Sequence, residues 1–206
     1  MKLYLPENLF KFIKKRLEDE TDPRLTYHNW EHTEKVMEQS EYFAGLCGKN
    51  LTEIKLLQTA ALFHDIGYLM RYDDNEGISA DYAGEILPEY GYTDDEIEEI
   101  KRMIRSTVLG TFPEHELDQI LCDADISHAG SPKFYAAGEK FRKELELVKG
   151  LVYTELDWIE LELQFLLNHE FKHCKIKKIL QSQKDKNIQK MRDFISAHQQ
   201  KTEADI

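Results

Sequence analysis

The apolar residues of this chain recur mostly at intervals of three and four positions, which is the spacing of one buried face of an α-helix. Leu9, Ile13 and Leu17 follow this spacing near the start, and Ile97 and Ile100 follow it in the middle. No alternating pattern of useful length competes with it. The pattern predicts an all-α fold with helices over residues 9–17, 33–46, 52–66, 79–87, 94–108, 116–126, 134–148, 154–171 and 175–198.

Residues that cap helices mark some of the predicted ends. Gly67 is expected to cap the helix over 52–66 at its C-terminus. Thr93 and Glu96 have the spacing of a capping box at the start of the helix over 94–108. The polar tail at 199–206 is expected to fray.

Composition limits the class of protein. The chain has 206 residues, of which 41% are hydrophobic, so it can bury a substantial core. We expect a single compact helical domain over 1–198, because no linker suggests a boundary. A formal net charge of −12 argues against duplex DNA or an anionic membrane as the main partner.

Two further features point to the cytoplasm. Pro6 and Glu7 interrupt the first apolar residues, and no later run reaches the roughly 18 apolar residues of a membrane span. The cysteines, Cys47, Cys122 and Cys174, are odd in number and form no C-x-x-C pair. They fit reduced thiols, and we expect them to be small buried hydrophobic residues.

Histidines and acids stand at positions where a metal site is chemically reasonable. His28 and His32 lie four residues apart, so at the start of a helix they would project from one face. His64 and Asp65 close an apolar run at 60–63, where a buried carboxylate is costly unless it is paired or binds a metal. A His–Asp hydrogen bond at a helix end is the simpler alternative for this pair.

Asp125 ends another apolar helix, where a helix cap or a salt bridge is the simpler alternative. One metal explains all these positions together, with His32, His64, Asp65 and Asp125 as a mixed nitrogen and oxygen site. Such a site suits Mn, Fe, Ni, Co, Zn or Mg. It can lower the pKa of a bound water to about 7 and polarise a phosphoryl oxygen, which predicts hydrolysis.

The motifs also resemble a known family. They are Tyr27-His28-Asn29-x-x-His32, His64-Asp65-Ile66-Gly67-Tyr68 and Asp123-Ala124-Asp125, in that order on a helical chain. This arrangement resembles the HD-domain superfamily of metal-dependent phosphohydrolases. The resemblance implies a helical HD domain with its motif core at about 25–130 and additional C-terminal helices at about 133–198.

The resemblance implies roles for the motif residues. His32, His64, Asp65 and Asp125 would bind one divalent metal, and Asp65 would also bridge to a second ion or orient the attacking water. His28 matches the general acid of cyclic-nucleotide phosphodiesterases, which share the Tyr-His-Asn-x-x-His stretch. A surface or capping histidine is the alternative for His28.

One departure from the family pattern concerns the second ion. Relatives often carry His-Glu a few residues after the His-Asp pair, where this chain has Asn75 and Glu76. Asn75 cannot replace an imidazole as a transition-metal ligand. One tight metal is therefore favoured, with Glu76 touching a bound water and Asp73 or Asp74 holding a weak second ion through waters.

Arginines near the motifs are candidates for binding the phosphate of a substrate. They are Arg24, Arg71 and Arg105, whose guanidinium groups suit bidentate contacts with phosphate oxygens. A solvated surface position is the alternative for each of them. Glu76 completes the set of candidate substrate-binding residues.

We therefore expect a metal-dependent phosphohydrolase in which a metal-bound water attacks a small phosphate ester, most plausibly a nucleotide. A cyclic-nucleotide-type phosphodiesterase is one alternative, because monoester and cyclic-diester cleavage use the same core. A non-catalytic metal- or nucleotide-binding regulatory module is the other. The expected partner is the small phosphorylated substrate, and the chain either dimerises with itself or acts alone.

Overall fold

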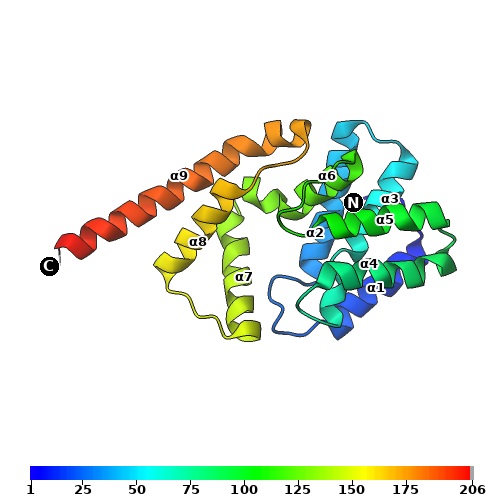
Figure 1. Ribbon diagram of the computed structural model, residues 1–206, viewed down its shortest axis with the longest axis horizontal. Coiled ribbons are helices and arrows are strands. Elements are labelled where there is room, and N and C mark those ends of the chain that lie inside the picture. Colours follow the sequence, from blue (N-terminus) through cyan, green and yellow to red (C-terminus); the bar gives the residue numbers. More distant parts are fainter. Residues whose placement is uncertain (205–206) are drawn as a thin grey trace. The chain divides into compact units, whose positions relative to one another are not determined.

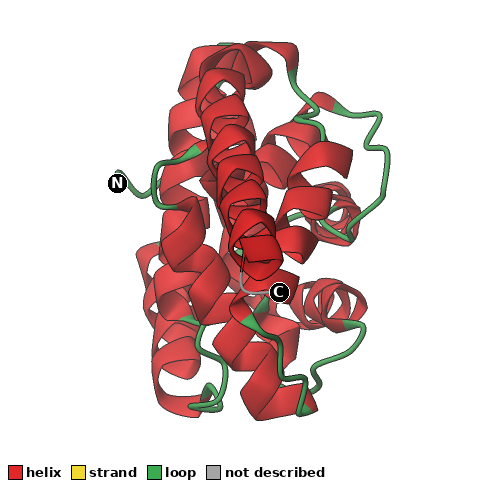
Figure 2. Cartoon of the chain, turned by 90° about the vertical axis from the view of Figure 1, so that its left-hand side faces the viewer, coloured by secondary structure: helices red, strands yellow, loops and turns green. Residues whose placement is uncertain are grey.

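The computed structural model describes residues 1–204, with side chains described through residue 200. Every regular element among these residues is a helix, as the colouring in Figure 2 shows. The prediction of an all-α fold is confirmed. Each predicted helix overlaps an observed one.

The chain forms two compact units, Met1–Ile126 and Ser127–Ile206, which are described separately. The prediction of one domain over 1–198 stays a prediction. The first unit contains α1 (Glu7–Glu20), α2 (Trp30–Cys47), α3 (Leu51–Phe63), η1 (Ile66–Leu69), α4 (Asn75–Ile86), η2 (Leu87–Tyr90), α5 (Asp94–Ser106) and α6 (Glu116–Asp125). Figure 1 labels the α-helices. The elements named η are short 3₁₀ helices.

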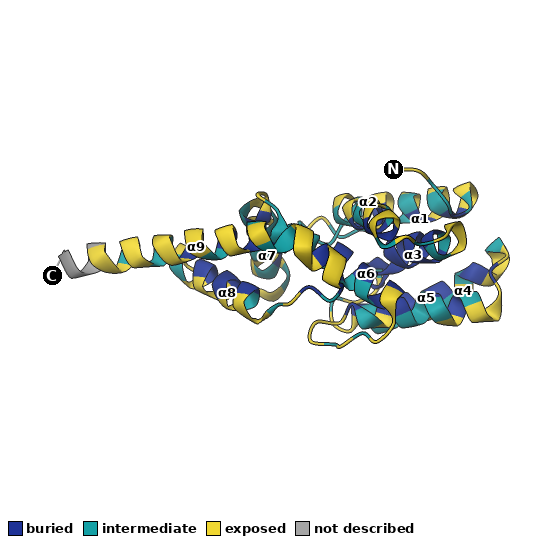
Figure 3. Ribbon diagram, turned by 90° about the horizontal axis from the view of Figure 1, so that it is seen from above, coloured by how far each residue is buried: buried dark blue, intermediate teal, exposed yellow. Residues whose placement is uncertain are grey.

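Helix α3 is the centre of the first unit. Its residues from Leu56 to Phe63 are all buried, and α2, α5 and α6 pack against it (Figure 3). A helix that is apolar on every side is expected at such a position. His64 and Asp65 follow directly at the end of this buried helix, so the fold places them inside the unit and away from bulk solvent.

The second unit contains α7 (Phe134–Lys149), α8 (Glu155–Asn168) and α9 (Cys174–Ala204), and it begins with Ser127 inside η3 (Ile126–Gly130). Helices α8 and α9 pack together, and Leu166 and Ile176 are fully buried. The buried Asn187 side chain donates hydrogen bonds to the backbone oxygens of Ala129 and Ser131, both at 3.0 Å. These bonds satisfy carbonyl groups that helix packing leaves open.

Helix ends agree with the sequence in one place and differ in another. The capping box of Thr93 and Glu96 at the start of α5 is confirmed. Gly67 is not a helix cap, because α3 ends at Phe63 with His64 as its C-cap. Gly67 lies inside η1, where the absence of a side chain serves close backbone packing.

Helix α9 runs through Ala204 and so includes residues that were expected to belong to a frayed tail. Residues 205–206 lie outside the described residues, and the fraying of the tail stays a prediction. No helix in the described part of the chain is long and apolar enough to cross a bilayer.

The cysteines are less buried than expected. Cys174, the first residue of α9, is exposed, and Cys47 and Cys122 are partly buried. The prediction of buried thiols is therefore wrong for Cys174. Cys122 donates a hydrogen bond to the backbone oxygen of Ser106 at 3.0 Å, and its burial raises the pKa of the thiol to about 12.

Candidate metal centre

The first unit brings four side chains together from two helices and one helix junction. His32 lies in the first turn of α2, behind the N-cap Asn29, whose side chain accepts a hydrogen bond from the backbone of Glu31 at 3.0 Å. His64 and Asp65 lie between α3 and η1, and Asp125 is the last residue of α6. All four predicted ligands therefore come from ends of rigid elements.

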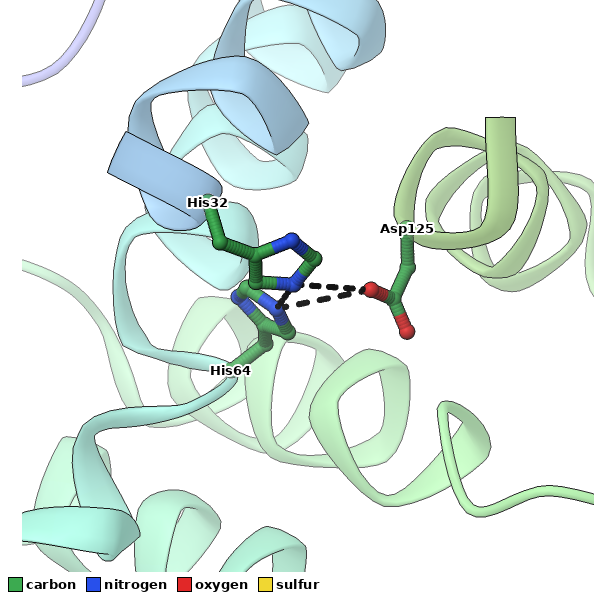
Figure 4. Close-up of side chains that lie close together, drawn as sticks. All are labelled: His32, His64 and Asp125. Atoms are coloured by element: carbon green, nitrogen blue, oxygen red, sulfur yellow. Dashed lines mark hydrogen bonds and ion pairs between the residues drawn. The ribbon is translucent and has the colours of Figure 1, made fainter. Parts of the chain in front are cut away.

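Their donor atoms converge on the Nε2 atoms of the two imidazoles. His32 Nε2 lies 3.2 Å from His64 Nε2 and 3.1 Å from Asp125 Oδ1, and His64 Nε2 lies 3.7 Å from the same oxygen (Figure 4). Asp65 Oδ2 lies 3.3 Å from His32 Nε2 and 3.1 Å from His64 Nε2. The spacing of His32, His64 and Asp125 is close enough for one ion to contact all three.

The tautomer of His64 follows from its other ring nitrogen. Nδ1 lies 2.8 Å from the backbone oxygen of Ala61, and a carbonyl oxygen can only accept a hydrogen bond. Nδ1 therefore carries the proton and donates a hydrogen bond to the backbone oxygen of Ala61. The lone pair of neutral His64 then lies on Nε2 and faces the other ligands, which is the usual arrangement of a metal-binding histidine.

Asp65 holds a buried oxygen that the protein leaves without a hydrogen bond. The residue is 9% exposed, and Oδ2 has no hydrogen-bond partner within the described residues. Its backbone, at φ −110° and ψ 5°, lies in a sparsely populated region that active-site residues often occupy. Burying an unsatisfied carboxylate oxygen is costly unless a cation approaches it, so the donor set fits a divalent metal.

The electrostatics of the cluster favour positive charge at its centre. Burial opposes charge on His32, but the neighbouring carboxylates of Asp125 and Asp65 outweigh it and raise the His32 pKa to about 10. The pKa of His64 is also raised against its burial by Asp65. The pKa values of Asp65 and Asp125 are lowered despite burial, because both carboxylates face the imidazoles. A divalent cation would satisfy the same field.

Asn75 contacts the centre in a way that the sequence did not indicate. Its Nδ2 donates a hydrogen bond to Asp65 Oδ1 at 3.3 Å, and the residue is buried. From the sequence, we inferred only that Asn75 cannot replace an imidazole as a metal ligand. No local pattern reports a contact between a loop carboxylate and the first residue of a helix ten positions later.

His28 lies at the edge of the centre and precedes α2. It stands before the N-cap, so the prediction that His28 and His32 share one helix face is wrong. The two rings still approach to 5.9 Å between centroids. His28 stacks on Tyr68 at 4.3 Å and 22°, and Tyr68 Oη lies 3.3 Å from His28 Nε2. Its charge also helps to lower the pKa of Asp65.

Tyr68 therefore belongs to the neighbourhood of the site, and sequence reasoning missed its role. The only indication in the sequence was the position of Tyr68 in the motif, directly after Gly67. A motif position does not show that the Tyr68 ring stacks on His28. Tyr27 is a second aromatic neighbour, with its ring centroid 4.8 Å from that of His28 and 4.9 Å from that of His32. Aromatic rings thus restrict how His28 can turn.

Glu76 is half-buried and lies in the electrostatic field of the centre. Burial raises the pKa of its carboxyl group, and the charges of Asp65 and Asp125 raise it further. Negative charge is therefore concentrated on this side of the centre. Glu76 as a substrate contact stays a prediction.

The candidate arginines are exposed, and each is paired with a nearby acid. The N–O distances are 2.6 Å for Arg24–Asp22, 2.6 Å for Arg71–Asp74 and 2.8 Å for Arg105–Asp81. Exposed pairs of this kind are weak, so a phosphate could displace the acid. Phosphate binding by these arginines stays a prediction.

Comparison with known proteins agrees with the motifs. The sequence profile of the HD domain matches residues 29–130, a range that includes the four clustered side chains. No curated protein gave a significant match. Among solved structures, the chain is similar to the crystal structure of a predicted HD superfamily hydrolase from an uncultured Thermotogales bacterium, with 24% sequence identity and a TM-score of 0.53. The similarity covers 78% of this chain and 86% of that chain, and shows that the two share a fold.

Proposed function

Because the chain belongs to the HD-domain superfamily, a family of metal-dependent hydrolases, we propose that it hydrolyses a small phosphate ester at the centre of His32, His64, Asp65 and Asp125. The observation that carries the proposal is the buried Asp65 Oδ2, which has two imidazole nitrogens beside it and no hydrogen bond. A divalent ion in such a site lowers the pKa of a coordinated water to about 7 and polarises a phosphoryl oxygen.

The chain's own residues would have separate tasks in this reaction. His32 and His64 would bind the ion through Nε2, and Asp125 would bind it through Oδ1. Asp65 Oδ2 would complete the set and help to orient the attacking water. Asn75 keeps the Asp65 carboxylate in position through Oδ1.

His28 would supply the proton for the leaving oxygen. An unprotonated alkoxide is a poor leaving group, so a proton donor at the edge of the centre raises the rate of hydrolysis. The position of His28 beside His32, with its ring stacked on Tyr68, supports this role. The arginines Arg24, Arg71 and Arg105 remain candidates for the phosphate, and a nucleotide is the substrate we propose.

The first test measures metal and hydrolysis on the same preparations. Wild type, Asp65→Asn and the control Asp19→Asn, which removes an exposed carboxylate on α1, are purified and their metal content is determined. Each is assayed against nucleotides, cyclic nucleotides and generic phosphate esters. We expect about one ion per chain and hydrolysis in wild type and Asp19→Asn, and loss of both in Asp65→Asn.

Other outcomes would change the proposal in distinct ways. Hydrolysis of cyclic nucleotides alone would identify a phosphodiesterase. Metal bound without hydrolysis of any ester would favour a non-catalytic metal- or nucleotide-binding module. Hydrolysis that survives Asp65→Asn unchanged would contradict the metal mechanism.

A further inference from the structure

The two oxygens of Asp65 face different surroundings. Oδ2 lies among the imidazoles of His32 and His64 and has no hydrogen bond. Oδ1 points the other way and accepts the hydrogen bond from Asn75 Nδ2. A carboxylate with both oxygens open can bridge two cations, whereas this one presents a single open oxygen.

The orientation of the Asn75 amide is fixed by chemistry. An ionised carboxylate can only accept hydrogen bonds, so the NH₂ group of Asn75 faces Asp65 Oδ1. Asn75 Nδ2 lies 3.3 Å from Asp65 Oδ1, within hydrogen-bond distance. The positively polarised amide hydrogens therefore occupy the place from which a second cation would have to approach this oxygen.

The backbone holds Asn75 in this place. Helix α4 begins at Asn75, which is 4% exposed, and packs against η1. The contact is so close that a Cβ atom on Gly67 would lie 2.1 Å from the backbone oxygen of Asn75. Gly67 also donates a hydrogen bond from its backbone to Ser79 Oγ at 2.8 Å. The backbone of Asn75, which carries the side-chain amide, is thus part of a tight junction.

The negative charge on this side of the centre would favour a second cation. Glu76 follows Asn75 directly, is half-buried, and feels the charges of Asp65, Asp125 and Asp74. A second cation would gain electrostatic energy on this side of the centre. What the arrangement lacks is a free oxygen on Asp65 that the cation could share.

We propose that Asn75 limits the centre to one ion, because its side-chain amide closes Asp65 Oδ1 to a second cation. This inference rests on the proposed metal centre. Asn75 is a positioning residue, since it acts through Asp65 and not on the substrate. Replacing the amide by a carboxylate should open the second position.

The test is the number of Mn²⁺ ions bound per chain, determined by equilibrium titration and by electron paramagnetic resonance. Wild type is compared with Asn75→Asp and with Asn50→Asp, which makes the same change at another helix N-terminus, the N-cap of α3. We expect about one tightly bound ion in wild type and Asn50→Asp, and about two in Asn75→Asp. The two ions of Asn75→Asp should show a spin-coupled signal, because they share Asp65.

Each other outcome has a defined meaning. Two ions in wild type, or one ion in Asn75→Asp, would overturn the role of Asn75. No ion in wild type would overturn the proposed metal centre and the role of Asn75 with it. One ion in wild type without hydrolysis would contradict only the proposed activity, since the number of ions bound still tests the role of Asn75.

A second variant covers the case in which Asn75→Asp does not fold, as checked by circular dichroism. Asn75→Ser removes the amide hydrogens and keeps a residue that suits a helix N-terminus. We expect a weaker second ion in this variant, detected at higher Mn²⁺ concentration. A single ion in Asn75→Ser at saturating Mn²⁺ would contradict the proposal.

Discussion

At the scale of single residues, His28 can be separated from the ligands because it contacts Tyr68 and stands outside α2. We predict that His28→Asn lowers kcat by about 100-fold or more, since a general acid typically contributes this much. Metal content should stay unchanged, because His28 is not among the converging donor atoms. Metal analysis and steady-state kinetics on the same preparation test both statements.

The control for this substitution is His115→Asn. His115 is an exposed N-cap of α6 without a side-chain capping bond, and Asn is a good N-cap, so neither kcat nor metal content should fall. Equal kcat in His28→Asn and His115→Asn would remove His28 from the reaction. Loss of metal in His28→Asn would instead assign it a role in building the centre.

The sequence indicates the ligands far better than the residues around them. His64 and Asp65 stand out because polar groups close a buried apolar run, and Asp125 stands out for the same reason. These signals are local, so one sequence contains them. The hydrogen bond from Asn75 to Asp65 and the stacking of Tyr68 on His28 depend on how η1, α4 and the loop before α2 meet in space. Periodicity carries no information about such contacts.

At the scale of elements, the junction of η1 and α4 supports the centre, and Gly67 makes it possible. A Cβ at this position would lie 2.1 Å from the Asn75 backbone oxygen and 2.9 Å from Ser79 Oγ. We predict that Gly67→Ala destabilises the protein by about 1–3 kcal/mol, the usual cost of overpacking. It should also weaken metal binding, because Asn75 and Asp65 shift relative to each other. Chemical denaturation and metal titration measure the two effects.

Gly45 provides a matched control within α2. A Cβ there would meet nothing within 4 Å, and Gly45 is helical. Gly45→Ala should therefore stabilise the protein by about 0.5–1 kcal/mol and leave metal binding unchanged. If both glycine variants behave alike, the close approach at Gly67 does not support the centre.

The same junction explains where element prediction from the sequence ends. In the 13-residue α3, apolar residues such as Ile54, Leu57 and Ala61 recur over several turns, so their spacing reveals the helix. The four-residue η1 offers no repeat, and the helix predicted over 52–66 therefore extends past the observed end of α3 at Phe63. Gly67 then suggests a helix cap, whereas the tertiary packing of α4 is what requires a glycine there.

At the scale of the whole molecule, the buried charges of the centre make the stability of the metal-free chain depend on pH. Asp65 and Asp125 have lowered pKa values, so they contribute stability above about pH 4 that is lost on acidification. His32 has a pKa raised to about 10, so its contribution is complete below about pH 6.5 and is lost as the pH rises towards 10. The metal-free chain should therefore be most stable between about pH 4 and 6.5.

Metal reverses this dependence, because the imidazoles of His32 and His64 must be neutral to bind it. Protons compete with the ion at low pH, so the stabilisation by metal grows as the pH rises. At an ion concentration of about 100 times Kd, binding adds about 2.7 kcal/mol, or about 5–10 °C in Tm for a chain of this length.

We predict that the difference in Tm between Mn²⁺-loaded and chelator-treated protein is small near pH 5.5 and reaches this size near pH 8. Thermal denaturation at both pH values measures it, with Asp65→Asn as the variant that should show no difference at either. If this Tm difference is the same at pH 5.5 and pH 8, protons on His32 and His64 do not compete with the ion, and the ion does not bind to these imidazoles.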